Sequence, residues 1–221
     1  STFGIKHCCI MRRLPVYLVI DTSGSMYGEP IEAVKNGIDL LVSSLRQDPH
    51  ALETAYLSVI SFDDKAQQVV PLTELADFQV PSIEAGGWTA LGDALSLTAN
   101  CIANEVKKNT PDSKGDWKPL IFIMSDGVPT DDWKQGFDKL KAIKPGLIIP
   151  CSVGSLEATS ILKQLAEGVV HLPTADSATI GAFFKWVTQS VSMSSQKVDS
   201  NQGDAVIGDL PPPPPEINFV Y

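Results

Sequence analysis

Five oxygen-bearing side chains in three separated segments have the types and spacing of a cation site. Asp21, Ser23 and Ser25 alternate in the first segment, Thr89 follows two glycines, and Asp126 opens the third. Two carboxylates and three hydroxyls suit a hard divalent ion, with Mg2+ the first candidate and Mn2+ or Ca2+ the alternatives. Because hydroxyl ligands add no charge, such an ion would stay electrophilic and could accept a carboxylate from another molecule.

The same residues also have a simpler explanation as helix caps. Asp21 and Ser25 could cap a helix that begins near Pro30, and Thr89 is a suitable N-cap for the helical pattern that follows it. Each capping interpretation is reasonable when a residue is taken alone. The joint occurrence of the residues after predicted strands favours a metal site.

The elements that must position these residues are strands of an α/β sheet. Residues 16–20 and 120–124 are continuous apolar runs, typical of strands that are buried on both faces, and Asp21 and Asp126 follow them. Ligands of open α/β sheets bind beyond the carboxyl ends of strands, where the direction of the connections reverses. We therefore expect the three segments to meet at one edge of the sheet.

Strand and helix patterns alternate along most of the chain. Further strands are expected at residues 57–62, 67–72, 147–153 and 169–172, and helices at 31–45, 89–106, 133–140, 156–165 and 178–191. This order predicts an α/β, doubly wound, mostly parallel six-stranded sheet with one antiparallel edge strand and helices on both faces. We expect an N-terminal extension over residues 1–10, a domain over 11–194, and a polar and proline-rich tail over 195–221.

The tail contains five consecutive prolines at residues 211–215. Such a run favours a polyproline II rod and cannot join the interior of a sheet. One interpretation is a stiff, exposed tail. The other is a ligand strip for a partner or for the domain's own surface, which Phe219 and Tyr221 would favour because exposed aromatic side chains gain by finding a groove.

Charge and hydropathy restrict the classes of partner and the location. The formal net charge is −9, so nucleic acid and anionic membranes are poor partners. No apolar run approaches the roughly 20 residues that a membrane-spanning helix needs, and the N-terminus lacks a signal-peptide pattern. These features predict a soluble protein.

The four cysteines favour a reducing, cytoplasmic location. Cys8 and Cys9 are adjacent and cannot form an ordinary disulfide, while Cys101 and Cys151 lie in apolar stretches. Capture of a soft metal by Cys8 and Cys9 beside His7 is an alternative, although no second ligand pair at zinc spacing follows.

The three polar segments resemble the metal-ion-dependent adhesion site (MIDAS) of von Willebrand factor A (VWA) domains, and the resemblance covers roughly residues 14–191. It implies that Asp21, Ser23, Ser25, Thr89 and Asp126 hold Mg2+ or a similar ion. It also implies a protein-binding module rather than an enzyme, with a partner that donates an Asp or Glu carboxylate to the metal.

A narrower resemblance links residues 11–31, residues 125–131 and the proline-rich end to the TerY-like proteins of bacterial tellurium-resistance gene clusters. It implies a cytoplasmic component of a tellurite, stress-response or defence system with kinase- or phosphatase-like partners. Residues 1–10 depart from that pattern.

Five residues near the expected crevice are candidates for contact with a partner: Tyr27, Glu29, Trp88, Asp131 and Trp133. An exposed aromatic side chain beside a metal would anchor a partner well. Trp88 has an equally good alternative, in which it simply packs its loop against the first helix.

Catalytic motifs are mostly missing. A dehalogenase-type phosphatase needs an acidic residue two positions after its first aspartate, where this chain has Ser23, and no P-loop lysine follows the glycines at 86–87. His7, His50 and His171 lie outside the proposed site segments. An Mg-dependent phosphohydrolase on the same sheet and thiol-based metal handling remain the alternatives to a binding module.

Overall fold

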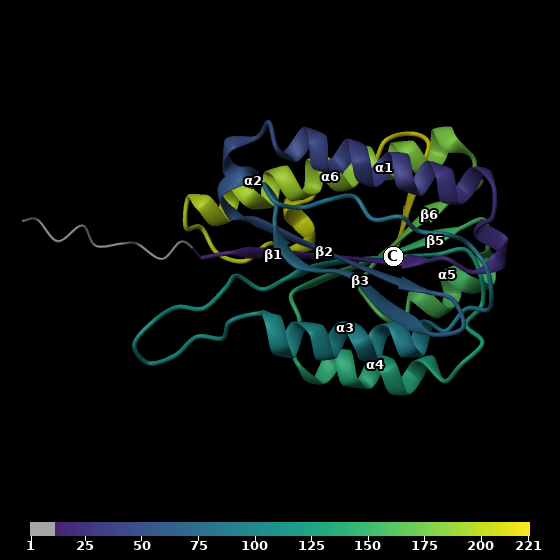
Figure 1. Ribbon diagram of the computed structural model, residues 1–221, viewed down its shortest axis with the longest axis horizontal. Helices are drawn as coiled ribbons and strands as arrows, with labels where there is room; N and C mark the ends of the chain where they lie inside the picture. The colour runs from purple at the N-terminus through teal and green to yellow at the C-terminus, as the bar shows by residue number, and fades with distance from the viewer. Residues whose placement is uncertain (1–11) are drawn as a thin grey trace, which may run out of the picture.

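Buried apolar strands form the centre of the molecule, which the computed structural model describes over residues 12–221 (Figure 1). Neighbouring strands run in the order β3-β2-β1-β4-β5-β6-β7. The five inner strands are parallel, and both edge strands are antiparallel to their neighbours. The strands are β1 (Leu14–Asp21), β2 (Ala55–Phe62), β3 (Ala66–Glu74), β4 (Leu120–Ser125), β5 (Leu147–Val153), β6 (Val169–Leu172) and β7 (Asn218–Val220).

Helices cover both faces of the sheet (Figure 1). One face carries α1 (Glu29–Leu45), α2 (Pro49–Thr54) and α6 (Ser177–Asp199), and the other carries α3 (Leu91–Glu105), α4 (Trp133–Ala142) and α5 (Leu156–Leu162). Two short 3-10 turns, η1 (Gly24–Met26) and η2 (Ile207–Asp209), complete the described elements. The sheet thus separates two hydrophobic clusters, a larger one between the sheet and α1, α2 and α6 (the α1–α6 cluster) and a smaller one between the sheet and α3, α4 and α5 (the α3–α4 cluster).

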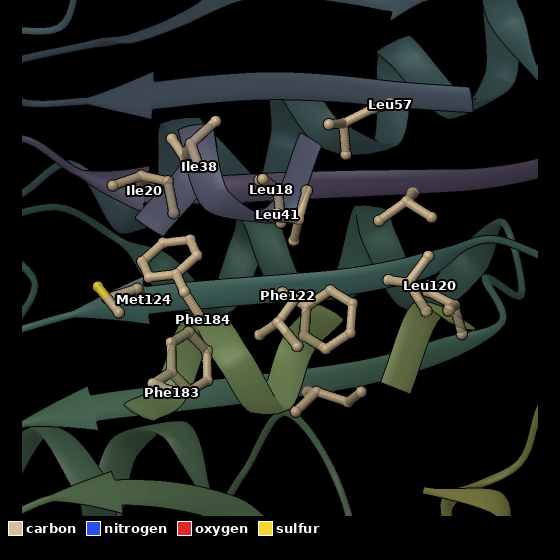
Figure 2. Close-up of a cluster of buried hydrophobic side chains, with 14 of the residues drawn as sticks. Leu18, Ile20, Ile38, Leu41, Leu57, Leu120, Phe122, Met124, Phe183 and Phe184 are labelled. Carbon is tan, nitrogen blue, oxygen red and sulfur yellow. The ribbon is translucent and has the colours of Figure 1, made fainter. Parts of the chain in front are cut away.

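The α1–α6 cluster packs side chains of the central strands against both helices. Figure 2 shows Leu18 and Phe122 from the sheet between residues of α1 and α6. The two helices approach so closely at Gly37 that a Cβ there would lie 2.4 Å from the ring of Phe184. A glycine at this position of α1 therefore lets Phe184 fill the space between the helices.

The doubly wound α/β fold is confirmed, but the sheet has seven strands rather than the predicted six, and two antiparallel edges rather than one. The extra strand, β7, lies in the segment expected to form the tail, and it pairs with β6. Helix α6 also continues to Asp199, past residue 194.

Aromatic contacts explain why the proline-rich segment docks on the domain. The indole Nε1 of Trp186 donates to the carbonyl of Pro211 at 2.8 Å, and the rings of Trp186 and Phe219 meet edge to face with centroids 6.3 Å apart. Ile217 is buried as well. Of the two interpretations of the tail, contact with the domain's own surface is the one that the structure contains.

Two other sequence predictions concern membranes and thiols. Across residues 12–221, no helix combines the length and apolar character needed to cross a bilayer. Cys101 and Cys151 are buried free thiols, as their apolar surroundings predict. Cys8, Cys9, His7 and the extension over residues 1–10 lie outside the described residues.

Candidate metal centre

The two carboxylates of the predicted site lie side by side at the carboxyl edge of the sheet. Strands β1 and β4 are parallel neighbours in which Ile20 pairs with Met124, so β1 ends at Asp21 level with Ser125, the last residue of β4, and Asp126 follows directly. Asp21 is fully buried. Its Oδ2 accepts a hydrogen bond from the Ser125 hydroxyl at 2.9 Å and a longer one from the Asp126 amide at 3.4 Å.

The serine hydroxyls of the first segment turn towards the same point. The amide of Ser23 donates to Asp21 Oδ1 at 2.7 Å. Its Oγ lies 3.2 Å from the Oγ of Ser25 and 3.5 Å from Oδ1 of Asp126. The Ser23 hydroxyl is thus within hydrogen-bonding reach of two other predicted ligand side chains.

Backbone hydrogen bonds hold the third segment against the other two. The Gly24 amide donates to the Gly87 carbonyl at 3.0 Å. On the other side, the Thr130 amide donates to the Thr89 carbonyl at 2.9 Å, and the Thr89 amide donates to the Thr130 hydroxyl at 3.2 Å. The Thr89 hydroxyl lies 3.8 Å from the position that a Cβ on Gly127 would occupy. All three predicted segments therefore meet at this edge.

The capping explanation for these residues is wrong. Within the described chain, α1 begins after Gly28 and α3 after Ala90, and neither helix has a side-chain cap at that position. At the start of α3, the carboxylate of Asp131 accepts from the amides of Gly92 and Asp93 at 2.8 and 2.9 Å. Asp21, Ser25 and Thr89 therefore do not cap α1 or α3.

The electrostatics of the site favour a positive ion. Burial raises the pKa of Asp21 from 3.8 to about 7, and the nearby charge of Asp126 adds to that rise. Hydrogen bonds from Ser23 and Ser125 oppose the shift without cancelling it. A cation between the two carboxylates would offset the repulsion between their negative charges.

The donor set fits a hard ion better than a soft one. Among residues 12–221, no three side chains of the His, Cys, Asp and Glu types gather where they could hold a metal. A cation at this edge would therefore depend on the two carboxylates together with neutral hydroxyls, a combination that suits Mg2+ and similar ions.

The five predicted partner contacts separate into two groups. Tyr27 and Trp88 are 81% and 71% exposed. The other three have structural contacts: Glu29 Oε1 accepts from the Ser177 amide at 2.8 Å, Asp131 caps α3, and Trp133 is partly buried against the α3–α4 cluster.

Sequence reasoning missed two exposed apolar residues on this edge and one residue that supports Asp21. Val128 follows β4, and Leu156, which is 75% exposed, follows β5. Their positions just after predicted strands could have indicated them. Ser125, which donates to Asp21, follows the apolar run at residues 120–124 and was given no role, because a buried serine carries no periodic signal of its own.

The fold and this edge together define a class of protein. Residues 16–179 match the family described as von Willebrand factor type A domain, and the chain belongs to that family. The VWA resemblance in the sequence is thereby confirmed.

Two curated relatives share part of the chain. Human inter-alpha-trypsin inhibitor heavy chain H6 is 27% identical over 124 residues, which are 52% of this chain and 9% of that protein. The uncharacterized protein sll0103 of Synechocystis is 32% identical over 123 residues, which are 52% of this chain and 26% of that protein. The matched part is thus a small share of each relative's length.

Solved structures share the fold at low identity. A von Willebrand factor type A protein from Catenulispora acidiphila has a TM-score of 0.62 at 19% identity, covering 82% of this chain and 43% of that one. The pilus adhesin SpaC from Lactobacillus rhamnosus GG has a TM-score of 0.67 at 12% identity, covering 83% and 31%. Proximal thread matrix protein 1 from the mussel byssus, with a zinc-occupied MIDAS motif, has a TM-score of 0.57 at 18% identity, covering 81% and 48%.

Proposed function

We propose that this chain is a divalent-metal-dependent protein-binding module. Its metal ligands would be Asp21, Ser23, Ser25, Thr89 and Asp126. The observation that carries the proposal is the meeting of the three segments that bear these side chains at one sheet edge, where none of the side chains caps α1 or α3. The zinc-occupied MIDAS motif of the mussel protein supports a cation at this place in the fold.

The chemistry of the ligands explains why a partner would be needed. Two carboxylates can balance the charge of a divalent ion, and the three hydroxyls add none. The bound ion would supply a Lewis-acidic position for one more oxygen ligand. We infer that an Asp or Glu carboxylate of a protein partner completes the set, and that Mg2+ is the first candidate for the ion, with Mn2+ and Ca2+ next.

An apolar rim around this edge supports a protein as the partner. We define the apolar rim as Tyr27, Trp88, Val128 and Leu156, all of which are exposed. Tyr27, Val128 and Leu156 follow β1, β4 and β5, and Trp88 lies in the loop before α3, where its amide donates to Asp64 in the β2–β3 turn. Exposed aromatic side chains carry much of the energy at protein interfaces. A partner would place its carboxylate at the centre and its apolar side chains on the rim.

The hydrogen bonds of the described histidines support binding rather than hydrolysis. His50 Nδ1 lies 2.6 Å from Asp199 Oδ2, and His171 Nδ1 lies 3.0 Å from Ser152 Oγ. Neither ring contacts the two carboxylates of the candidate site. The site therefore offers ligands for an ion but no imidazole base beside them.

The cellular setting that we propose rests on the TerY-like sequence segments. It is a cytoplasmic tellurite or stress-response system of bacteria, in which kinase- or phosphatase-like proteins of the same gene cluster are the partners. Capture of such a protein by the wild-type chain in Mg2+, and its release by EDTA, would be the expected result.

One set of variants tests the metal and the partner separately. Thr89→Ala should weaken Mg2+ binding by about tenfold in calorimetric titration, because it removes one ligand. Trp88→Ala should keep the Mg2+ affinity and lose capture of the partner. Leu40→Ala, an exposed apolar residue on α1, is the matched control and should change neither. Unchanged Mg2+ binding in both Thr89→Ala and Ser23→Ala would overturn the proposal, as would capture that is insensitive to EDTA.

A further inference from the structure

A cavity lies at the amino edge of the sheet, at the opposite end of the strands from the candidate metal centre. Its volume is about 250 Å3, and it is formed by the ends of α3 and α4 and the start of β4. The loop between α3 and β4 projects beyond the sheet at this end (Figure 1). We call it the basal pocket, and its apolar lining is Ile102, Val106, Trp117, Pro119, Ile143 and Pro145.

Four lysines surround this apolar lining: Lys107, Lys108, Lys118 and Lys144. Across residues 12–221, none of them forms a salt bridge with a carboxylate. They are four of the 17 basic residues in a chain of net charge −9. Such a concentration of positive charge around an apolar cavity is unusual for this surface, and it favours an anionic ligand.

The acidic residue of the pocket does not neutralise these lysines. The carboxylate of Asp116 accepts from the Arg13 guanidinium at 2.6 and 2.9 Å and from the Lys107 amide at 2.8 Å. A further cation, Arg12, lies over the Trp117 ring with its guanidinium carbon 3.5 Å from the ring centroid. The pocket is therefore both apolar inside and positively charged at its rim.

Lys144 occupies a backbone conformation that disfavours a side chain. Its φ is +49°, in the left-handed region where glycine is the usual residue and other residues are strained. A glycine at this position would end α4 with less backbone strain. A lysine at this point of the rim is therefore poorly explained by helix termination alone.

We propose that the basal pocket binds a small amphipathic anion, with an apolar aryl or acyl body and one carboxylate, sulfonate or phosphate group. The apolar lining would bury the body, and the lysines would hold the anionic group. The cavity volume of about 250 Å3 lies just below the roughly 300–1,000 Å3 of drug-sized ligand pockets, so it suits a small ligand rather than a folded partner. The simpler alternative is that these lysines only offset the negative ends of the α3 and α4 dipoles, and the test separates the two.

Fluorescence titration of the whole chain with 8-anilinonaphthalene-1-sulfonate tests the proposal, with N-phenyl-1-naphthylamine as a neutral probe of the same shape. We expect the sulfonate to bind more tightly than the neutral probe. Lys144→Gly should weaken sulfonate binding by about threefold to fivefold, the effect of one exposed charge pair, while raising the melting temperature because the strain is removed. Lys163→Gln, which removes a lysine at the end of α5 outside the pocket, should leave the affinity unchanged.

Equal binding of the two probes, or unchanged sulfonate affinity in both Lys144→Gly and Lys118→Gln, would overturn the proposal. A lower melting temperature in Lys144→Gly would also overturn it, since the lysine would then stabilise the C-terminal end of α4. Amide shifts on sulfonate binding should fall in residues 102–119 and 143–146, and shifts confined to other regions would count against the pocket. Displacement of the sulfonate by decanoate or by phenyl phosphate supports an acyl or an aryl phosphate ligand respectively, and displacement by neither contradicts the proposal.

Discussion

The carboxyl group of Asp21 lies buried beside Asp126, and this position raises its pKa to about 7. A cation needs the ionised form of Asp21, so proton loss and metal binding are coupled. We expect the apparent Mg2+ affinity to rise by about tenfold per pH unit below pH 7 and to level off above it. Calorimetric titrations between pH 5.5 and 8.5 measure this dependence, and a constant affinity across that range would contradict it.

The same residue should lower the stability of the metal-free protein. The pKa of Asp21 is higher in the folded state than its usual 3.8. Protonated Asp21 therefore leaves the stability of the folded state at its full value below pH 3.8, and that stability is lost as the pH rises through about 7 and the buried carboxyl ionises. In EDTA at pH 8, Asp21→Asn should therefore raise the free energy of unfolding by about 1–3 kcal/mol. The gain should vanish near pH 4.

Urea denaturation of the wild type and of Asp21→Asn at both pH values measures this difference. Asp39→Asn, which changes an exposed carboxylate on α1, is the matched control and should alter stability by less than about 0.5 kcal/mol. Equal stability of Asp21→Asn and the wild type at pH 8 would show that the burial of Asp21 carries no such cost.

The positions of the candidate ligands could be predicted from the sequence because polar residues directly after buried parallel strands must lie at the carboxyl edge of the sheet. Asp21 and Asp126 follow apolar runs, and their strands are neighbours. The contacts of Glu29 and Asp131 could not be predicted, because each depends on an amide from another element, Ser177 on α6 or Gly92 on α3.

At the level of elements, the contact between α1 and α6 depends on a single glycine. Gly37→Ala would place a methyl group 2.4 Å from the Phe184 ring, so we expect a loss of about 1–3 kcal/mol in the free energy of unfolding. Gly181→Ala on α6 is the matched control, because a Cβ there would meet nothing within 4 Å. It should stabilise the protein by about 0.5–1 kcal/mol. Similar effects from both substitutions would contradict the close packing.

The docked C-terminal segment can be tested with two aromatic residues. Phe219 packs against Trp186 and fills the space above Gly168, whereas Tyr221 is 82% exposed. Phe219→Ala should lower the free energy of unfolding by about 1–3 kcal/mol, and Tyr221→Ala by less than about 0.5 kcal/mol. Denaturation of both variants measures the difference, and a neutral Phe219→Ala would indicate that β7 adds nothing to the sheet.

Periodicity predicted the inner strands and the larger helices but not β7. Strands β1 and β4 are buried at every residue, which gives a continuous apolar run that local reasoning can read. Strand β7 has three residues, too few for a pattern, and five prolines precede it closely. Its pairing comes from tertiary contacts of Trp186 and Phe219, which no local signal reports.

At the level of the whole molecule, the sheet separates two regions of opposite character. The carboxyl edge brings Asp21 and Asp126 together and would attract a cation. The amino edge holds the lysines of the basal pocket and would attract an anion. A ligand at one edge therefore need not compete with a ligand at the other, and partner binding and small-molecule binding can be measured independently.

The unequal size of the two hydrophobic clusters has a consequence for local unfolding. The α3–α4 cluster is the smaller, so that layer should open more often than the α1–α6 layer. Native-state hydrogen exchange should then show faster exchange of the α3 and α4 amides, and slower exchange there once Mg2+ is added. Thr89 stands at the start of α3, whereas Asp21 and Asp126 lie at the ends of central strands. When the α3–α4 layer unfolds locally, Thr89 would be the first ligand to move away from the ion. The lifetime of the bound ion would therefore report on the opening of that layer.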